Sequence, residues 1–214
     1  MIRIITIERE YGCGGGVIAK KLADRLGWKL WDQLMTCEIA RLCHCTENEV
    51  EGREERVDPL YYRLFKSVLR GSFEGSLNLP RLQLLDADSI LRITEQVTQM
   101  AAKEGNCVIV GRGSQHFLRD RNDTLRVFLY APEEAKVRRL TAEGMSRTEA
   151  EGSVRTVDSE RAAFIERYFH RQWPTRSSYH AMLNTAVGDE SVVSTILELK
   201  DAVETWAESK SSAG

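Results

Sequence analysis

The sequence predicts a three-layer α/β domain, in which helices cover both faces of a parallel sheet. Short apolar runs typical of buried strands alternate along the chain with segments of helical periodicity. Strands separated by helices favour parallel pairing through crossover connections. A length of 214 residues and a hydrophobic content of 42% suit one domain with a substantial core. We therefore expect a single domain over residues 1–207 and a disordered tail over 208–214.

The strands of this sheet are expected in short segments rich in apolar and β-branched residues. Such runs are typical of strands that are buried on both faces. They lie at residues 2–7, 28–32 ("WKLWD"), 107–113 ("CVIVGRG"), 125–132 ("LRVFLYAP") and 179–185 ("YHAMLNT"). A parallel sheet binds its ligand at the carboxyl ends of its strands, so we expect the functional site at that edge.

Helices are expected between and after these strands. Ile18, Leu22 and Leu26 show the helical spacing of the first one. The segments "TENE" at 46–49 and "SRTE" at 146–149 are capping boxes that predict new helix starts. The expected helices cover residues 16–26, 33–45, a short segment opened by 46–49, a segment from Pro59, 86–103, 132–140, 147–156, 158–171 and 191–207, with a mobile loop over 70–80.

The charge and cysteine content exclude several classes of protein. The net charge of −2 gives no general attraction to nucleic acid or to an anionic membrane. No apolar run is long enough to span a bilayer, and the N-terminal pattern differs from a signal peptide, so we expect a cytoplasmic protein. Five cysteines, an odd number, favour reduced thiols. "CHC" at 43–45 has no second cluster, so a metal site is not predicted.

The stretch "EREYGCGGG" at residues 8–16 follows the first expected strand directly. Glycines in such a strand-to-helix turn allow backbone amides to surround an anion without help from a side chain. The standard phosphate-loop pattern fails, because Arg9 replaces its first glycine, Gly15 its lysine and Gly16 its hydroxyl residue. A dinucleotide-binding pattern fails as well, since its third glycine would be Val17. The stretch alone leaves a phosphate site and a simple tight turn equally open.

Four segments together resemble the cytidylate kinase-like family, a divergent branch of the nucleoside monophosphate kinases. They occur in the family's order over nearly the whole chain: "ITIEREYGCGGGVIAKKLADRLGWKLWDQ", "CVIVGRGSQHFLRD", "LRVFLYAPEEAKVRRL" and "DSERAAFIERYFHRQWPTRSSYHAMLNT". The resemblance implies a P-loop NTPase fold with a five-stranded parallel sheet. It also implies an acceptor-binding insert over about residues 45–100 and a lid over about 141–165.

The resemblance also implies a set of site residues. The phosphate-binding turn would consist of Arg9, Gly12, Cys13, Gly14, Gly15 and Gly16. The acceptor phosphate would be contacted by Arg112, and the lid would contribute Arg155, Asp158 and Arg161. The chain departs from the family's pattern at three points, since it lacks the loop lysine, has Gly113 in place of an acidic residue and has Cys13 in place of serine.

Asp32 is a further candidate, because it ends the expected strand at 28–32. Its carboxylate suits three roles: holding magnesium through water, orienting an acceptor hydroxyl, or capping the helix that follows. The residues alone do not separate these interpretations.

The resemblance implies an ATP-dependent phosphotransferase that uses Mg²⁺ and a small nucleotide or other phosphate acceptor, for which the family name suggests CMP. Arg9, Arg112, Arg155 and Arg161 are the candidates to replace the missing lysine. Arginine stays charged when it is desolvated and binds phosphate oxygens in pairs. The alternative is a non-catalytic nucleotide-binding or regulatory protein that keeps the kinase fold, and a degenerate dinucleotide-binding module is the least favoured hypothesis.

Overall fold

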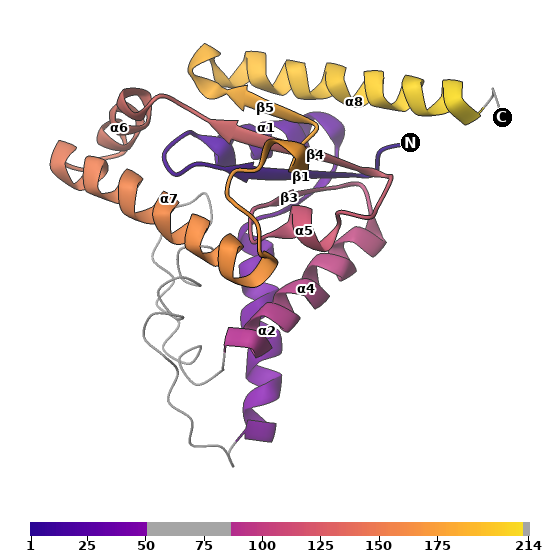
Figure 1. Ribbon diagram of the computed structural model, residues 1–214, viewed down its shortest axis with the longest axis horizontal. Coiled ribbons are helices and arrows are strands. Elements are labelled where there is room, and N and C mark those ends of the chain that lie inside the picture. The colour runs from indigo at the N-terminus through magenta and orange to yellow at the C-terminus, as the bar shows by residue number, and fades with distance from the viewer. Residues whose placement is uncertain (51–86, 212–214) are drawn as a thin grey trace.

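The structure contains a five-stranded parallel sheet, which confirms the predicted α/β fold (Figure 1). The computed structural model describes residues 1–50 and 87–211. The strands are β1 (Ile4–Arg9), β2 (Lys29–Trp31), β3 (Cys107–Val110), β4 (Thr124–Tyr130) and β5 (Ala181–Asn184). All neighbouring pairs are parallel, so the carboxyl ends of the strands meet at one edge.

β1 is the central strand, in the order β2-β3-β1-β4-β5. Ile4 lies opposite Cys107 of β3 and Thr124 of β4, and all residues of β1 are buried. From β1 the chain continues to β2 at one end of the sheet, whereas from β3 it continues to β4 in the opposite direction. Right-handed connections in opposite directions lie on opposite faces, and they open a crevice at the end of β1.

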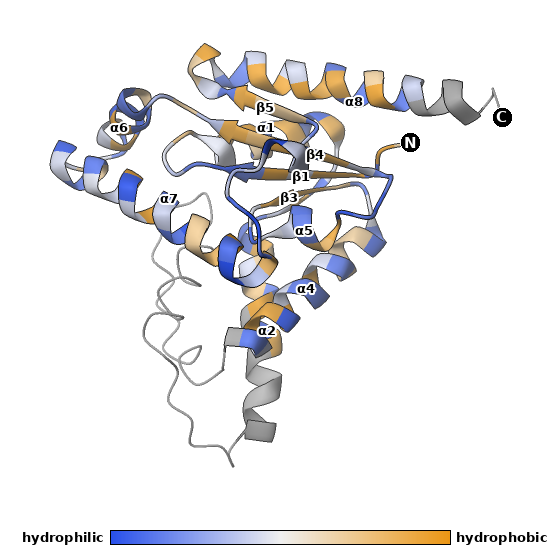
Figure 2. Cartoon of the chain, viewed as in Figure 1, coloured by the Kyte–Doolittle hydropathy of each residue, from blue (hydrophilic) through white to orange (hydrophobic). Residues whose placement is uncertain are grey.

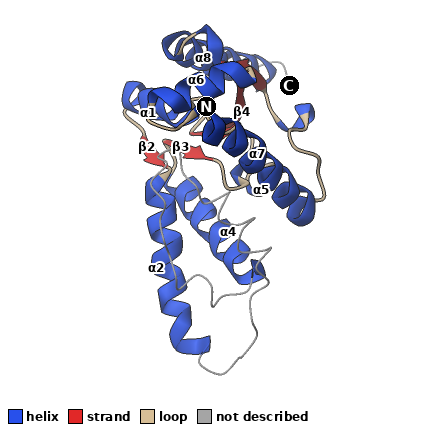
Figure 3. Ribbon diagram, turned by 90° about the vertical axis from the view of Figure 1, so that its left-hand side faces the viewer, coloured by secondary structure: helices blue, strands red, loops and turns tan. Residues whose placement is uncertain are grey.

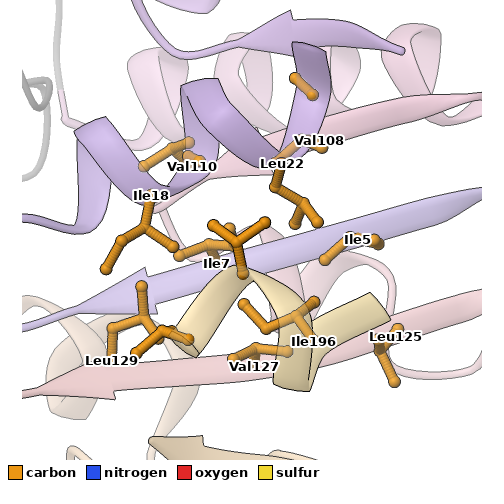
Figure 4. Packing of buried hydrophobic residues seen from close by; sticks show 14 of the residues in the cluster. Ile5, Ile7, Ile18, Leu22, Val108, Val110, Leu125, Val127, Leu129 and Ile196 are labelled. Atoms are coloured by element: carbon orange, nitrogen blue, oxygen red, sulfur yellow. The ribbon is translucent and has the colours of Figure 1, made fainter. Parts of the chain in front are cut away.

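α1 (Gly15–Leu26) and α8 (Asp189–Ser211) cover one face of the sheet. Leu22 of α1 and Ile196 of α8 belong to one buried cluster with Ile7 of β1 (Figure 4). Burial of each such side chain contributes about 1.5–3 kcal/mol relative to exposure. This layer therefore fixes α1, and with it the loop that precedes α1.

α2 (Gln33–Val50), α4 (Ala87–Glu104) and α7 (Arg147–Phe169) lie on the opposite face. Each contributes to one buried cluster, through side chains that include Met35, Val97 and Phe164. α2 and α4 pack side by side and extend away from the sheet (Figures 1 and 3). The predicted acceptor-binding insert lies mostly outside the described residues.

α6 (Glu133–Ala142) packs against α7 beside the carboxyl ends of the strands (Figure 1). Val137 of α6 and Val154 of α7 form a separate small cluster with Tyr11 of the glycine loop. β1 and β4 are mainly hydrophobic, whereas α6 and α7 present mostly hydrophilic residues (Figure 2). None of the helices in the described part of the chain combines the length and the apolar character needed to cross a membrane.

The prediction of two helices over 147–156 and 158–171 was wrong, because α7 is continuous. Ser146 and Glu149 form the predicted capping box at its start. No glycine or proline interrupts the chain around Val157, and buried positions continue at helical spacing through Phe164.

Other boundary predictions differ from the structure or lie outside the residues that it describes. α2 continues through 46–49 to Val50, so the capping box there does not open a new helix. α8 extends to Ser211, so the tail expected to be disordered from 208 is helical up to that residue. The helix expected from Pro59 and the loop expected at 70–80 lie outside the described residues.

His116 provides a pH-dependent test of this packing. It lies in α5 (Ser114–Phe117) and stacks on Phe169 with a centroid distance of 4.4 Å. Burial, aided by the charges of Arg171 and Arg119, lowers the pKa of His116 to about 4. The folded state therefore binds fewer protons than the unfolded state between about pH 6.5 and pH 4, and stability falls as pH falls through this window.

We expect His116→Phe, which keeps the ring stack, to reduce this pH dependence. Urea unfolding should show the wild type losing about 1–3 kcal/mol more than the variant between pH 7.5 and pH 4.5. Equal losses in the two proteins would contradict the assignment to His116.

Candidate functional site

The loop between β1 and α1 places the predicted glycines at the carboxyl edge of the sheet. Gly12 and Gly14 have φ angles of 74° and 80°, in the left-handed region that glycine adopts without strain. Gly14 is the N-cap of α1 and makes no side-chain cap hydrogen bond. The first N–H groups of a helix have no intrahelical partner and lie at the positive end of its dipole. The loop therefore has the geometry of an anion-binding nest.

A cavity of about 50 Å³ lies over this loop. It is lined by the glycine backbone, by Arg139 and Glu143 around the end of α6, and by Arg9 and Arg161. Guanidinium groups beside a nest of amides strengthen the attraction for a phosphate group.

Arg139 is a cation of this site that sequence reasoning missed. A Cβ atom at Gly14 would lie 1.9 Å from Nη1 of Arg139, so the guanidinium rests directly on the loop. Nη2 of Arg139 also donates to Oδ1 of Asp189 at 2.9 Å. The available signal was the spacing of Lys136, Arg139 and Leu140, which puts all three on one face of α6.

Lys136, also missed, ties the loop to the helices behind it. Its Nζ donates to Oε2 of Glu10 at 2.9 Å and to Oδ2 of Asp158 at 3.2 Å. Oδ1 of Asp158 accepts the N–H of Tyr11 at 2.7 Å. Burial alone would lower the pKa of Lys136, but the hydrogen bond to Glu10 and the charge of Asp158 raise it on balance. The structure thus places Asp158, predicted as a lid residue, against the loop backbone.

A second cavity, of about 10 Å³, lies between the end of β1 and α7. Its charged lining consists of Glu8, Arg9, Arg112 and Arg161. Arg9 and Arg161 line both cavities. Three of the predicted arginines therefore gather at one place, together with Glu8, which sequence reasoning did not single out.

Arg161 is buried between the two cavities. Its Nη1 donates to the carbonyl oxygen of Arg9 at 2.9 Å and lies 3.6 Å from Oδ1 of Asp158. Burial lowers the pKa of Arg161 to about 10, and the neighbouring charge of Arg9 acts in the same direction. The guanidinium still carries its charge at neutral pH.

Arg112 and Asp32 come together at the ends of β3 and β2. Nη1 of Arg112 lies 3.5 Å from Oδ1 of Asp32 and donates to the carbonyl oxygen of Val110 at 3.0 Å. Nη2 of Arg112 donates to the hydroxyl of Thr36. Burial lowers the pKa of Arg112 to about 10, although the charge of Asp32 opposes this. Asp32 is thus a counter-ion of Arg112, while its roles toward magnesium or a hydroxyl stay predictions.

Arg155 lies away from the predicted site. Its side chain is 73% exposed and its Nη2 lies 3.0 Å from Oε1 of Glu133. It lines neither of the two cavities. The structure therefore does not bring Arg155 together with Arg112 and Arg161.

Cys13 turns its thiol into the core, so within the predicted phosphate-binding turn it can offer only its backbone. Its Sγ lies 3.7 Å from the carbonyl oxygen of Leu129, and burial raises the pKa of the thiol to about 11. The carbonyl oxygen of Cys13 accepts the hydroxyl of Thr185 at 2.7 Å. Cys13 thus stabilises the loop through the hydrogen bond of its carbonyl oxygen and through the packing of its side chain in the core.

The loop fits a nucleotide polyphosphate, because its backbone cradle at Gly14 is closed by a guanidinium and leaves no room for a side chain. The described residues contain no group of three or more acidic, histidine or cysteine side chains that could hold a metal ion. The side chains of "CHC" at 43–45 lie outside the description. Mg²⁺ commonly relies on phosphates and waters with one or two carboxylates, for which Asp32 is the nearest candidate.

The strand order, the glycine loop between β1 and α1 and the cationic cavities define a protein of the P-loop kinase fold. Shikimate kinase from Bacteroides thetaiotaomicron shares this fold at 15% identity and a TM-score of 0.52, over 94% of this chain and 99% of that one. The chain belongs to the cytidylate kinase-like family, whose model matches residues 4–187. This membership supports a nucleotide kinase-type function.

Two further solved structures share the fold. An uncharacterized protein from Eubacterium ventriosum is 21% identical with a TM-score of 0.66, over 94% of this chain and 99% of that one. Shikimate kinase from Acinetobacter baumannii in complex with shikimate is 17% identical with a TM-score of 0.50, over 93% of each chain. None of the curated proteins matches the chain.

The role of Lys136 can be tested by Lys136→Met. The substitution leaves Glu10 and Asp158 without their shared counter-ion, and we expect a loss of roughly 2–3 kcal/mol, discounted because both acids are partly exposed. The exposed Lys20→Met should change the unfolding free energy by less than about 0.5 kcal/mol. Urea denaturation measures both, and equal effects would contradict the anchoring role.

Gly14→Ala should impair the nest more than it impairs folding. Gly144 is the matched control, because its φ of 105° is also positive but its Cβ would meet nothing within 4 Å. Both alanine variants should lose about 1–2 kcal/mol of stability from backbone strain. Only Gly14→Ala should weaken ATP binding, by about tenfold or more in calorimetry, and equal affinities would contradict the nest.

Proposed function

We propose that the chain is an ATP-dependent phosphotransferase of the nucleoside monophosphate kinase type, acting on CMP or a related small acceptor. The observation that carries the proposal is the pair of adjacent cavities that share Arg9 and Arg161. The larger lies over the glycine loop and suits the phosphates of Mg-ATP, and the smaller suits the reacting group of an acceptor. Phosphoryl transfer needs such positioning and charge neutralisation more than covalent chemistry.

The residues of the site divide this work between them. The loop amides bind phosphate oxygens, and Arg139 closes over the loop from α6. Arg161 and Arg9 face the space between donor and acceptor, where charge develops during transfer. Arg112 holds the acceptor side in concert with Asp32. ADP is the leaving group, and bound Mg²⁺ would neutralise the charge on its phosphates.

The alternative is a non-catalytic nucleotide-binding or regulatory protein of the same fold. The loop lacks the lysine that contacts the β- and γ-phosphates in the standard pattern. In addition, Arg112 and Arg161 are engaged with protein oxygens. In this alternative the chain binds ATP but releases no ADP with any acceptor.

Calorimetry with Mg-ATP followed by an ADP-release assay separates the hypotheses. The acceptors to test are the nucleoside monophosphates, with CMP first, and shikimate. Binding with turnover supports the phosphotransferase, and binding without turnover supports the regulatory alternative. Failure to bind ATP would contradict both.

Two single variants identify the cation that takes the place of the lysine. Arg139→Gln should weaken Mg-ATP binding by about 10–100-fold, the value of one charged hydrogen bond of about 1.5–3 kcal/mol. Arg138→Gln is the matched control, since Arg138 is the exposed neighbour on the same helix. If Arg9→Ala weakens binding while Arg139→Gln does not, Arg9 is the substitute and Arg139 is not.

A further inference from the structure

Glu8 is a buried carboxylate beside the glycine loop. It is the penultimate residue of β1 and is 4% exposed. Its hydrogen bond and ion pair within the described part of the chain both use Oε1, which accepts the N–H of Arg9 at 3.4 Å and lies 3.7 Å from Nη1 of Arg9. It lines the smaller cavity with Arg112 and Arg161. A carboxylate retained in such a buried cleft is a candidate for chemistry.

We propose that the acceptor is a small alcohol that carries an anionic group, and that Glu8 is the general base for its hydroxyl. This inference rests on the proposed phosphotransferase function. It narrows the acceptor from CMP or a related small acceptor to a compound that is phosphorylated on a hydroxyl group.

The size of the smaller cavity favours a hydroxyl group. Its volume of about 10 Å³ is close to the least that holds one water molecule, whereas the cavity over the loop has about 50 Å³. The room beside Glu8 thus matches a single hydroxyl oxygen. The hydroxyl therefore enters the small cavity while the remainder of the acceptor stays outside it.

The charges of the cavity agree with this choice. A phosphate acceptor attacks through an oxygen that is already ionised, so it has no proton for a carboxylate to take. An alcohol loses its proton as it attacks, and a carboxylate within hydrogen-bond reach accepts that proton. Arg9, Arg112 and Arg161 surround the single carboxylate of Glu8 and attract an anionic group on the same alcohol.

The transfer balances with these groups alone. The alcohol oxygen forms a bond to the γ-phosphorus of ATP, while the bond from that phosphorus to the bridging oxygen of ADP breaks. The electron pair of that bond leaves with ADP, and the hydroxyl proton passes to the carboxylate of Glu8 and then to solvent. The products are a phosphate monoester and ADP.

The test is an ADP-release assay of the full chain with Mg-ATP over a panel of hydroxy acids, polyol phosphates and sugar phosphates. Each hit is compared with its deoxy analogue, and CMP is run in parallel. We expect release with a hydroxylated compound, none with its deoxy analogue, and a phosphate monoester in the ³¹P NMR spectrum. No release with any alcohol, or conversion of CMP to CDP as the main activity, overturns the inference, and the latter leaves the phosphotransferase function intact.

Variants of Glu8 test its role as the base. Glu8→Gln should lower kcat for the alcohol by about 10²–10⁴-fold while the affinity for Mg-ATP, which also reports folding, changes less than about threefold. Glu8→Asp should recover part of the activity, and the acid limb of the pH–rate profile should be lost in Glu8→Gln. The exposed Glu104→Gln is the matched control and should keep the wild-type rate. A wild-type kcat and pH profile in Glu8→Gln would overturn the assignment.

Discussion

The shape of the glycine loop depends on two partly buried ion pairs, in which Lys136 bridges Glu10 and Asp158. Asp158 accepts a hydrogen bond from the N–H of Tyr11. Lys136, which lies in α6, donates hydrogen bonds to both Glu10 and Asp158. A loop rich in glycine has many conformations to lose on folding, so its amides converge on an anion only if something outside the loop holds them. The network supplies this restraint and connects the loop to α6 and α7 at the same time. Both cavities share the wall that Arg9 and Arg161 form beside this network.

Acidic side chains beside the arginines explain how cations gather so densely at one edge of the sheet. Burial lowers the pKa of Arg112 and of Arg161, and the neighbouring charge of Arg9 lowers both further. Such a group is stable only when counter-ions and hydrogen bonds replace the lost water. Asp32 is the counter-ion of Arg112, and Asp158 is the counter-ion of Arg161. The acids of the site thus maintain charges that would otherwise be too costly to bury, and they leave those charges directed at the cavities.

The strands and the glycine loop could be predicted from the sequence because their signals are local. The role of Lys136 could not, since it depends on α6 meeting a loop more than a hundred residues earlier in the chain. The position of Arg155, one helical turn before Asp158, does not by itself direct its side chain toward the loop. Six residues separate Arg155 from Arg161 along the continuous helix α7, so their side chains point in directions about 120° apart around its axis. Only Arg161 then faces the loop, and Arg155 faces solvent.

The absence of the lysine has a steric explanation, because the side chain of Arg9 occupies the space that a side chain at position 15 would need. Gly15 stands where the standard pattern has lysine, and a Cβ atom there would lie 2.9 Å from Cγ and 3.0 Å from Cβ of Arg9. These are atoms near the backbone of Arg9, which cannot swing aside as the end of a flexible chain can. With Arg9 in place of the first glycine of the pattern, the loop has no room for a side chain at position 15. A single packing constraint therefore removes the lysine and leaves a buried guanidinium beside both cavities.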